Sequence, residues 1–130
     1  MILSLFEHNT NKIKLPNLRL DENKKYEIAI LNYGAILEYS GESLKLRRFV
    51  QITYDGIQSL EGPHPYLVHM TSCWQIQHGF SQPVGKPLYL PLRTTDLSST
   101  CFKFIIEEGA SDFLTIFMQI EIVEVNDENK

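Results

Sequence analysis

The feature that most constrains the fold of this chain is a long apolar segment near its end, FLTIFMQIEIVEV, residues 113–125. Between 114 and 122 its even-numbered positions are all apolar: Leu114, Ile116, Met118, Ile120 and Ile122. Its odd-numbered positions mix polar and apolar side chains: Thr115, Phe117, Gln119, Glu121 and Val123. This alternation is typical of a β-strand, whereas an amphipathic helix would repeat its apolar positions at spacings of three and four.

A strand of this length presents a row of backbone donors and acceptors along each edge, and a bare edge is a template for aggregation. The segment is therefore expected to pair with strands on both sides or to close against a partner chain. If its second face is exposed in the monomer, Phe113, Phe117 and Val123 mark an assembly surface.

Strand patterns recur through the rest of the chain. Roughly eight to nine segments alternate or carry short apolar runs, and the turn signals between them have the spacing of a β-sandwich or barrel. Gly34 in KYEIAILNYGAILEY is expected to break that stretch into two strands or to mark a bulge, and Pro16 in KIKLPNLRL predicts an edge position or a bend. The best helical candidate is a single turn in LRTTDLSST, capped by Thr94 or Thr95. We expect one all-β domain over residues 1–125 and a disordered tail at 126–130.

Composition and charge limit the classes of protein to which the chain can belong. With 130 residues, 43% of them hydrophobic, it can bury the core of one domain. A formal charge of -4 disfavours a surface built entirely to hold nucleic acid but leaves room for a local basic patch. The N-terminal apolar run is too short for a signal peptide, and no window is apolar enough for a membrane span. We therefore expect an intracellular protein without membrane contact, in which Cys73 and Cys101 are thiols rather than a disulfide.

The sequence lacks the arrangements that catalysis or metal binding would need. Ser98 and Ser99 in TTDLSST and Cys73 in TSCWQ have no catalytic signature around them, and TTDLSST predicts a polar turn whose hydroxyls satisfy backbone groups. We expect no enzyme activity, no catalytic residues, no cofactor and no metal. His69, on an apolar strand, is expected to be a hydrogen-bonded core or rim residue. The histidines are scattered without metal-ligand spacing: His8, His64, His69 and His78.

Two groups of residues suggest interaction surfaces. The first is the one dense basic cluster, in KLRR: Lys45, Arg47 and Arg48. It is a candidate contact for nucleic-acid phosphates or for an acidic subunit, and the alternative is a solvated strand face. The second is a group of aromatic residues, a type common both in cores and at interfaces: Tyr66, Trp74, Phe80 and Tyr89. Together with Phe113 and Phe117, Trp74 and Phe80 are the candidate interface aromatics.

Four stretches follow one another in a suggestive order: NKIKLPNLRLDENKKYEIAILNY, FVQITYDGIQSLEGPHPYLVHM, KPLYLPLRTTDLSSTCFKFIIEEG and LTIFMQIEIVEV. The first leads through an acidic turn into a strand, the second is a strand, a turn and a short strand, the third resembles a hairpin, and the fourth a closing strand. In this order they resemble the small jelly-roll proteins that Polinton and Maverick elements and related viruses carry as minor capsid or penton proteins. The chain is short for that family and ends in VEVNDENK rather than in an aromatic or basic segment.

The resemblance implies a single jelly-roll-like antiparallel β-sandwich of about eight strands, in two four-stranded sheets. It implies a structural penton or minor capsid protein that assembles with copies of itself into a ring, with a pentamer favoured. Such a protein would be found in the virion, assembled inside the host cell, and would need no cofactor. A major capsid protein is the candidate neighbour, and Lys45, Arg47 and Arg48 are candidates for facing that neighbour or, in a weak contact, the genome.

Two other functions remain open on the residues alone. A jelly-roll module that binds a glycan, protein or receptor would use Trp74 or Phe80 to stack on its ligand. An enzyme on a β-barrel scaffold is the third possibility, although no constellation of residues favours it. Self-association separates the first two functions, because a chain that stays a strict monomer at high concentration argues against a capsid role.

Overall fold

The computed structural model describes residues 1–37, 45–58, 66–76, 79–106 and 113–126. These residues form an all-β sandwich of two antiparallel sheets, as the sequence predicts. The first sheet has five strands: β1 (Ile2–His8), β9 (Phe113–Val125), β3 (Lys25–Leu37), β6 (Gly79–Pro83) and β7 (Leu90–Pro91). The second sheet has four strands: β2 (Lys12–Lys14), β8 (Cys101–Ile106), β4 (Lys45–Tyr54) and β5 (Tyr66–Ile76).

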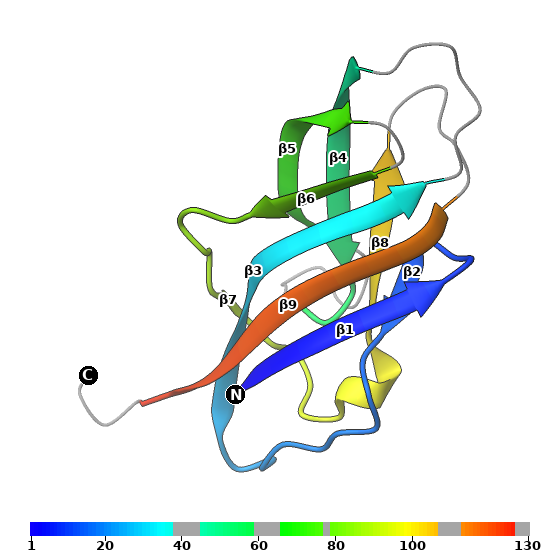
Figure 1. Cartoon of the computed structure of the whole chain (residues 1–130). Coiled ribbons are helices and arrows are strands. Elements are labelled where there is room, and N and C mark those ends of the chain that lie inside the picture. The colour runs from blue at the N-terminus through cyan, green and yellow to red at the C-terminus, as the bar shows by residue number, and fades with distance from the viewer. Residues whose placement is uncertain (38–44, 59–65, 77–78, 107–112, 127–130) are drawn as a thin grey trace.

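The strand order is that of a jelly roll. The first sheet runs β1-β9-β3-β6, with the short β7 added to β3, and the second runs β2-β8-β4-β5. The two sheets join at the corner between β5 and β6, where Ile76 pairs with Gly79, and an isolated bridge between Ile57 and Leu92 links the segments that follow β4 and β7. Figure 1 shows the strands of the first sheet crossing in front of the second. Apart from the hairpin of β4 and β5 within the second sheet, successive long strands alternate between the sheets, as in two Greek keys, and the jelly-roll expectation is confirmed.

Strand β9 lies inside the first sheet and is paired along both edges, as predicted. Its register with β1 runs from Ile2 opposite Glu121 to His8 opposite Thr115, and its other edge pairs with β3. Between residues 116 and 122 the even-numbered side chains are almost completely buried between the sheets: Ile116, Met118, Ile120 and Ile122. Burying each of these side chains stabilises the fold by roughly 1.5–3 kcal/mol.

Strand β3 is continuous through Gly34, so the predicted break or bulge at that glycine is wrong. Gly34 pairs with Phe117 on one side and with Ser81 on the other. The register with β9 shifts on either side of this glycine instead, between Ile30 and Asn32 and again between Ile36 and Leu37. A bulge bends a strand, and Figure 1 shows β3 bending from the lower end of the sandwich across its front.

The ends of the strand order lie on the opposite side of the sandwich from the β5–β6 corner. β1 ends the first sheet and the three-residue β2 ends the second. Pro16 lies two residues after the end of β2, which agrees with the edge position that a proline predicts. Of the predicted C-terminal tail, only Asn126 lies within the described residues.

Two consecutive buried hydrogen bonds lie where β4, β8 and the 3-10 turn η1 (Leu97–Ser99) meet. The Tyr54 hydroxyl donates to Thr100 Oγ1 at 2.8 Å, and the Thr100 hydroxyl donates to the carbonyl of Leu97 at 2.7 Å. The rings of Tyr54 and Phe102 stack with their centroids 4.0 Å apart. Because each hydroxyl has a partner, both can be buried without an unsatisfied polar group. Burial raises the pKa of Tyr54 far above its usual value.

Gly56 follows this tyrosine in the turn after β4, and the packing there leaves no room for a side chain. A Cβ atom at position 56 would lie 2.4 Å from Cζ of Tyr54, whose ring is held by its stack and its hydrogen bond. We expect Gly56→Ala to lower the free energy of unfolding in urea by about 1–3 kcal/mol. Gly85→Ala is the matched control, because nothing lies within 4 Å of its Cβ position. Equal urea midpoints for the two variants would contradict the close packing of Tyr54 on Gly56.

Candidate interaction surfaces

The predicted basic cluster lies in β4, beside β5. Lys45 is paired with Ile76, Arg47 with Trp74, and Arg48 with Cys73. The backbone therefore brings the basic cluster and Trp74, one of the candidate aromatics, to neighbouring strands. The side chains of these residues lie outside the described part of the structure, as do those of Phe80 and Phe113.

Three further lysines gather on the outer face of the second sheet, which we call the Lys103 face (Lys12, Lys14 and Lys103). All three are exposed, because their neighbours Ile13, Phe102 and Phe104 point into the core. Lys12 on β2 is directly opposite Lys103 on β8, and Lys14 is opposite Cys101. The sequence reasoning missed this face, although the alternation in KIK and CFKF is the signal that would have placed each lysine outward.

An apolar surface lies on the outer face of the first sheet, which we call the Phe6 face (Ile2, Phe6, Ile36 and Phe117). Phe6 is 64% exposed and is directly opposite the half-buried Phe117, while Ile2 is 55% exposed. The prediction that Phe117 points away from the core is confirmed. The sequence alone does not single out Phe6, because β1 carries apolar side chains at both its inward and its outward positions.

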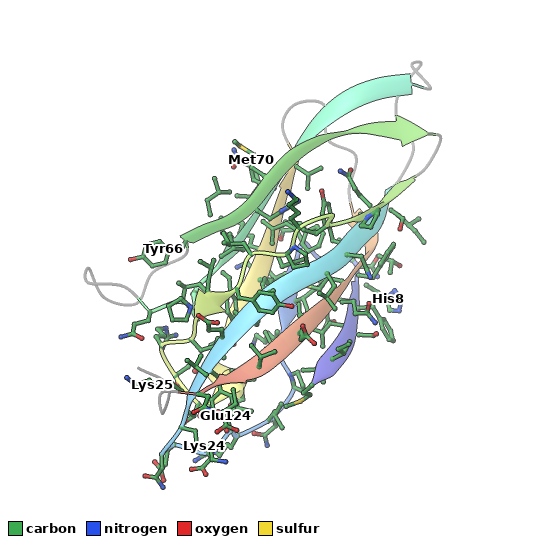
Figure 2. The ribbon with its side chains drawn as sticks, turned by 90° about the vertical axis from the view of Figure 1, so that its left-hand side faces the viewer. His8, Lys24, Lys25, Tyr66, Met70 and Glu124 are labelled. Atoms are coloured by element: carbon green, nitrogen blue, oxygen red, sulfur yellow. The ribbon has the colours of Figure 1, made fainter. Side chains whose placement is uncertain are left out.

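Polar contacts frame the Phe6 face. The side-chain amide of Asn32 donates to Gln119 Oε1 at 2.9 Å, and His8 Nδ1 lies 2.9 Å from Thr115 Oγ1. The Tyr89 hydroxyl donates to Glu121 Oε1 at 2.5 Å, and this hydrogen bond raises the pKa of Tyr89. In Figure 2, His8 on this face and Met70 on the outer face of the second sheet lie on opposite sides of the ribbon. The outer face of the second sheet also carries exposed apolar side chains beside its lysines: Leu67, Met70 and Ile105.

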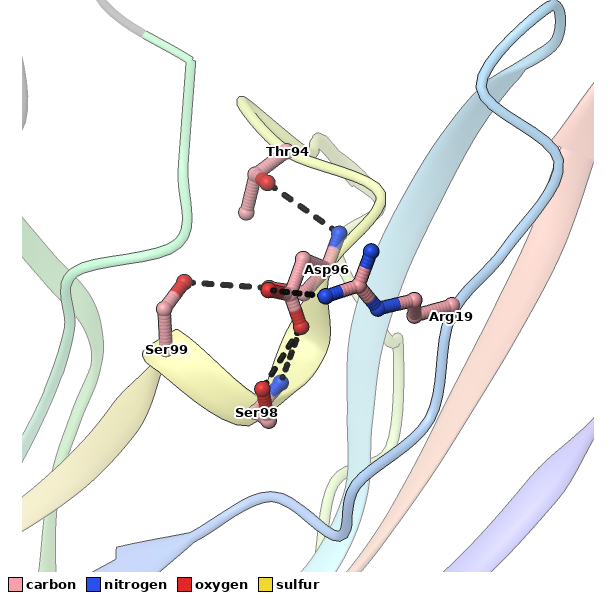
Figure 3. Close-up of polar contacts among 5 residues, drawn as sticks. All are labelled: Arg19, Thr94, Asp96, Ser98 and Ser99. Atoms are coloured by element: carbon pink, nitrogen blue, oxygen red, sulfur yellow. Dashed lines mark hydrogen bonds and ion pairs between the residues drawn. The ribbon is translucent and has the colours of Figure 1, made fainter.

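The segment TTDLSST forms the polar turn that the sequence predicts (Figure 3). Asp96, rather than Thr94 or Thr95, caps the 3-10 turn, because its Oδ1 accepts from the backbone N–H of Ser98 at 3.2 Å and from its hydroxyl at 2.6 Å. These hydrogen bonds hold the pKa of Asp96 below its usual value. The hydroxyl of Ser99 donates to the carbonyl of Asp96 at 3.0 Å, and the two serines serve to close this turn.

His69 points from β5 toward the core, where its Nε2 lies 3.2 Å from the Tyr33 hydroxyl. The two rings meet edge to face with centroids 4.9 Å apart, and Tyr33 is fully buried. Burial lowers the pKa of His69, because a charged imidazole would lose hydration there. The prediction of a hydrogen-bonded core or rim histidine is confirmed.

Cys101 is a free, half-buried thiol, and burial raises its pKa. The side chain of Cys73 lies outside the described part of the structure. Among the described residues, no group of three or more His, Cys, Asp or Glu side chains is placed to hold a metal ion. The described part also contains no helix that is long and apolar enough to cross a membrane.

Comparison with known proteins assigns no family to the chain. No protein-family model matches it, and no curated protein matches its sequence. The jelly roll itself is a fold shared by proteins of many functions. Its two outer faces are therefore the features that bear on function.

The contact between His69 and Tyr33 predicts how stability depends on pH. The folded-state pKa of His69 lies below its unfolded value of 6.5, so the unfolded chain binds the proton more readily. The contribution of His69 to the free energy of unfolding is complete above pH 6.5. It is lost as the pH falls from 6.5 toward the folded-state pKa. Urea unfolding at pH 7.5 and pH 5.0 should therefore show a smaller loss of stability for His69→Gln than for the wild type. Parallel pH profiles for the two proteins would show that His69 does not titrate in the core.

Proposed function

We propose that this chain is a structural protein that assembles with copies of itself, as a penton or minor capsid protein of a viral particle. The Phe6 face carries the proposal, because it is an exposed apolar surface at the edge of a jelly roll. The resemblance of the strand pattern to small jelly-roll capsid proteins supports the viral assignment and a place in the virion. The proposed assembly is a closed ring, with five copies favoured by that resemblance.

The chemistry of the Phe6 face is that of an interface between copies. Phe6, Phe117 and Ile36 occupy neighbouring positions on β1, β9 and β3. Apolar patches with polar rims mark interaction sites on soluble proteins, and interfaces between identical chains are more apolar than the rest of the surface. Aromatic side chains at such interfaces often contribute a large part of the binding energy.

The position of β1 suits a contact between subunits. Because β1 ends the strand order, no described strand lies beside its outer edge. An edge strand with exposed apolar side chains favours association with another chain. A ring of five copies needs a head-to-tail interface, so the Phe6 face of one copy would meet a different surface of the next copy.

A ligand-binding role is the second candidate function, favoured by a polar groove of about 340 Å³ at the lower end of the sandwich. Lys24, Lys25 and the opposing Glu124 lie at this end in Figure 2. The groove brings cations, hydroxyls, a tyrosine and one carboxylate, that of Glu22, together, which is a combination suited to a polar sugar or peptide. Its lining includes Lys24, Lys25, Tyr26, Arg93, Thr94 and Thr95.

Native mass spectrometry and light scattering over a range of concentrations test the proposed assembly. The wild type should form a defined oligomer, with a pentamer expected. Phe6→Ser should raise the dissociation constant by at least about tenfold, because it removes an interface aromatic worth more than about 1.4 kcal/mol. Its fold should be retained, since Phe6 is largely exposed.

Met70→Ser is the matched control for this experiment. Met70 is 57% exposed, similar to Phe6, but lies on the other outer face. Its substitution should leave the oligomer unchanged. A wild type that stays a strict monomer at the highest soluble concentration would contradict the assembly proposal and favour the ligand-binding role.

A further inference from the structure

We propose that the Lys103 face binds the phosphate backbone of a nucleic acid, independently of base sequence. This binding goes beyond the proposed assembly and does not require it. The Lys103 face and the Phe6 face belong to different sheets and point away from each other. One surface can therefore hold a polyanion while the other contacts a second copy of the chain.

The fold divides the charges of its strands between the two sheets. The four strands of the second sheet contain no Asp or Glu, although the whole chain carries a formal charge of -4. Their cationic residues are Lys12, Lys14, Lys45, Arg47, Arg48 and Lys103. In the first sheet the strands carry one cation, Lys25, and four carboxylates: Glu7, Glu27, Glu121 and Glu124.

The arrangement of lysines on the Lys103 face costs stability. Lys12 and Lys103 occupy directly opposite positions on neighbouring strands, where like charges are destabilising. The described part of the structure shows no ion pair to either of them or to Lys14. Two described carboxylates, Asp55 and Glu7, lie near enough to the Cys101 thiol to contribute to its raised pKa. Asp55 Oδ1 already accepts a hydrogen bond from the backbone N–H of Cys101 at 2.8 Å.

Protection of a sheet edge explains only part of this arrangement. Lysines on an edge strand hinder aggregation, and β2, which carries Lys12 and Lys14, is an edge strand. Lys103 is on β8, which is paired on one side with β2 and on the other with β4. An interior strand needs no such protection. A binding role accounts for all three lysines together.

The geometry of the face suits a polymer of phosphates. Lys12, Lys103 and Thr53 form one row across β2, β8 and β4, and neighbouring strands are about 4.8 Å apart. Lysine, threonine and glutamine side chains are typical phosphate contacts, and Gln51 lies in the adjacent row beside Ile105. Lys103 is directly opposite Lys12, and Lys14 lies two residues along β2 from Lys12, or about 7 Å, so the three side chains can contact neighbouring phosphates of one strand.

The carboxylates of the first sheet are a poorer partner for this face. Glu121 already accepts a hydrogen bond from Tyr89, and Glu124 lies 3.6 Å from Lys24 Nζ. A second copy of the chain that used Glu121 or Glu124 would therefore have to break these contacts in order to neutralise the lysines. Nucleic-acid phosphates come with displaceable counterions, whose release drives binding.

Fluorescence anisotropy with a labelled single-stranded oligothymidylate at low salt tests the proposal. The wild type should bind, with an affinity that falls steeply as salt is added. In the triple variant Lys12→Gln, Lys14→Gln, Lys103→Gln the affinity should fall at least about tenfold, and the slope of log affinity against log salt should fall by about 2, at roughly 0.7 for each phosphate contact. The same variant should melt at an equal or higher temperature, because a like-charge contact is removed.

The single variants Lys103→Gln and Lys86→Gln have the same net charge and form a matched pair, because Lys86 is exposed and lies outside both the Lys103 face and the polar groove. Lys103→Gln should lower the affinity, whereas Lys86→Gln should retain the wild-type affinity and slope. The Phe6→Ser variant should also bind the oligonucleotide, which separates this proposal from the assembly proposal. The proposal is overturned if the wild type does not bind, or if Lys103→Gln and Lys86→Gln lose affinity equally. It is also overturned if vesicles rich in phosphatidylserine bind the protein while the oligonucleotide does not.

Discussion

The pairing of β9 along both of its edges is the constraint on which the rest of the structure depends. By lying between β1 and β3, the last strand joins the first segment of the chain to the third. Its fixed register turns Ile116, Ile120 and their neighbours toward the second sheet, and that buried face holds the two layers together. The same register fixes the outward direction of Phe117 and the place of Phe6 beside it. One strand therefore determines both the core and the Phe6 face.

The part of the fold that depends on local alternation could be predicted from the sequence. The two faces of residues 113–125, the edge position near Pro16 and the polar turn around Asp96 all follow from patterns within a few residues. The bulge near Leu31 could not be predicted, because it arises from the pairing of β3 with β9. The local sequence favoured a bulge at Gly34 instead, because glycine is the residue that most often marks one. Strand pairing over long separations is likewise absent from local patterns.

The candidate surfaces show the same limit. The cluster KLRR can be recognised in the sequence, because its cations are close together along the chain. The Lys103 face cannot be recognised in this way, because Lys12 and Lys103 come from distant parts of the chain. Only the pairing of β2 with β8 reveals that these two charges are neighbours. Phe117 was recognised from its own strand, but its partner Phe6 needed the register between β1 and β9. Surfaces built by a sheet are visible once the strand order is known.

We propose a different function for each outer face: self-association for the Phe6 face and phosphate binding for the Lys103 face. Hydrogen–deuterium exchange measured by mass spectrometry tests this division directly. Raising the protein concentration should slow exchange in β1, and adding the oligonucleotide should slow it in β2 and β8. Protection of the same strands under both conditions, or of neither set, would contradict the account.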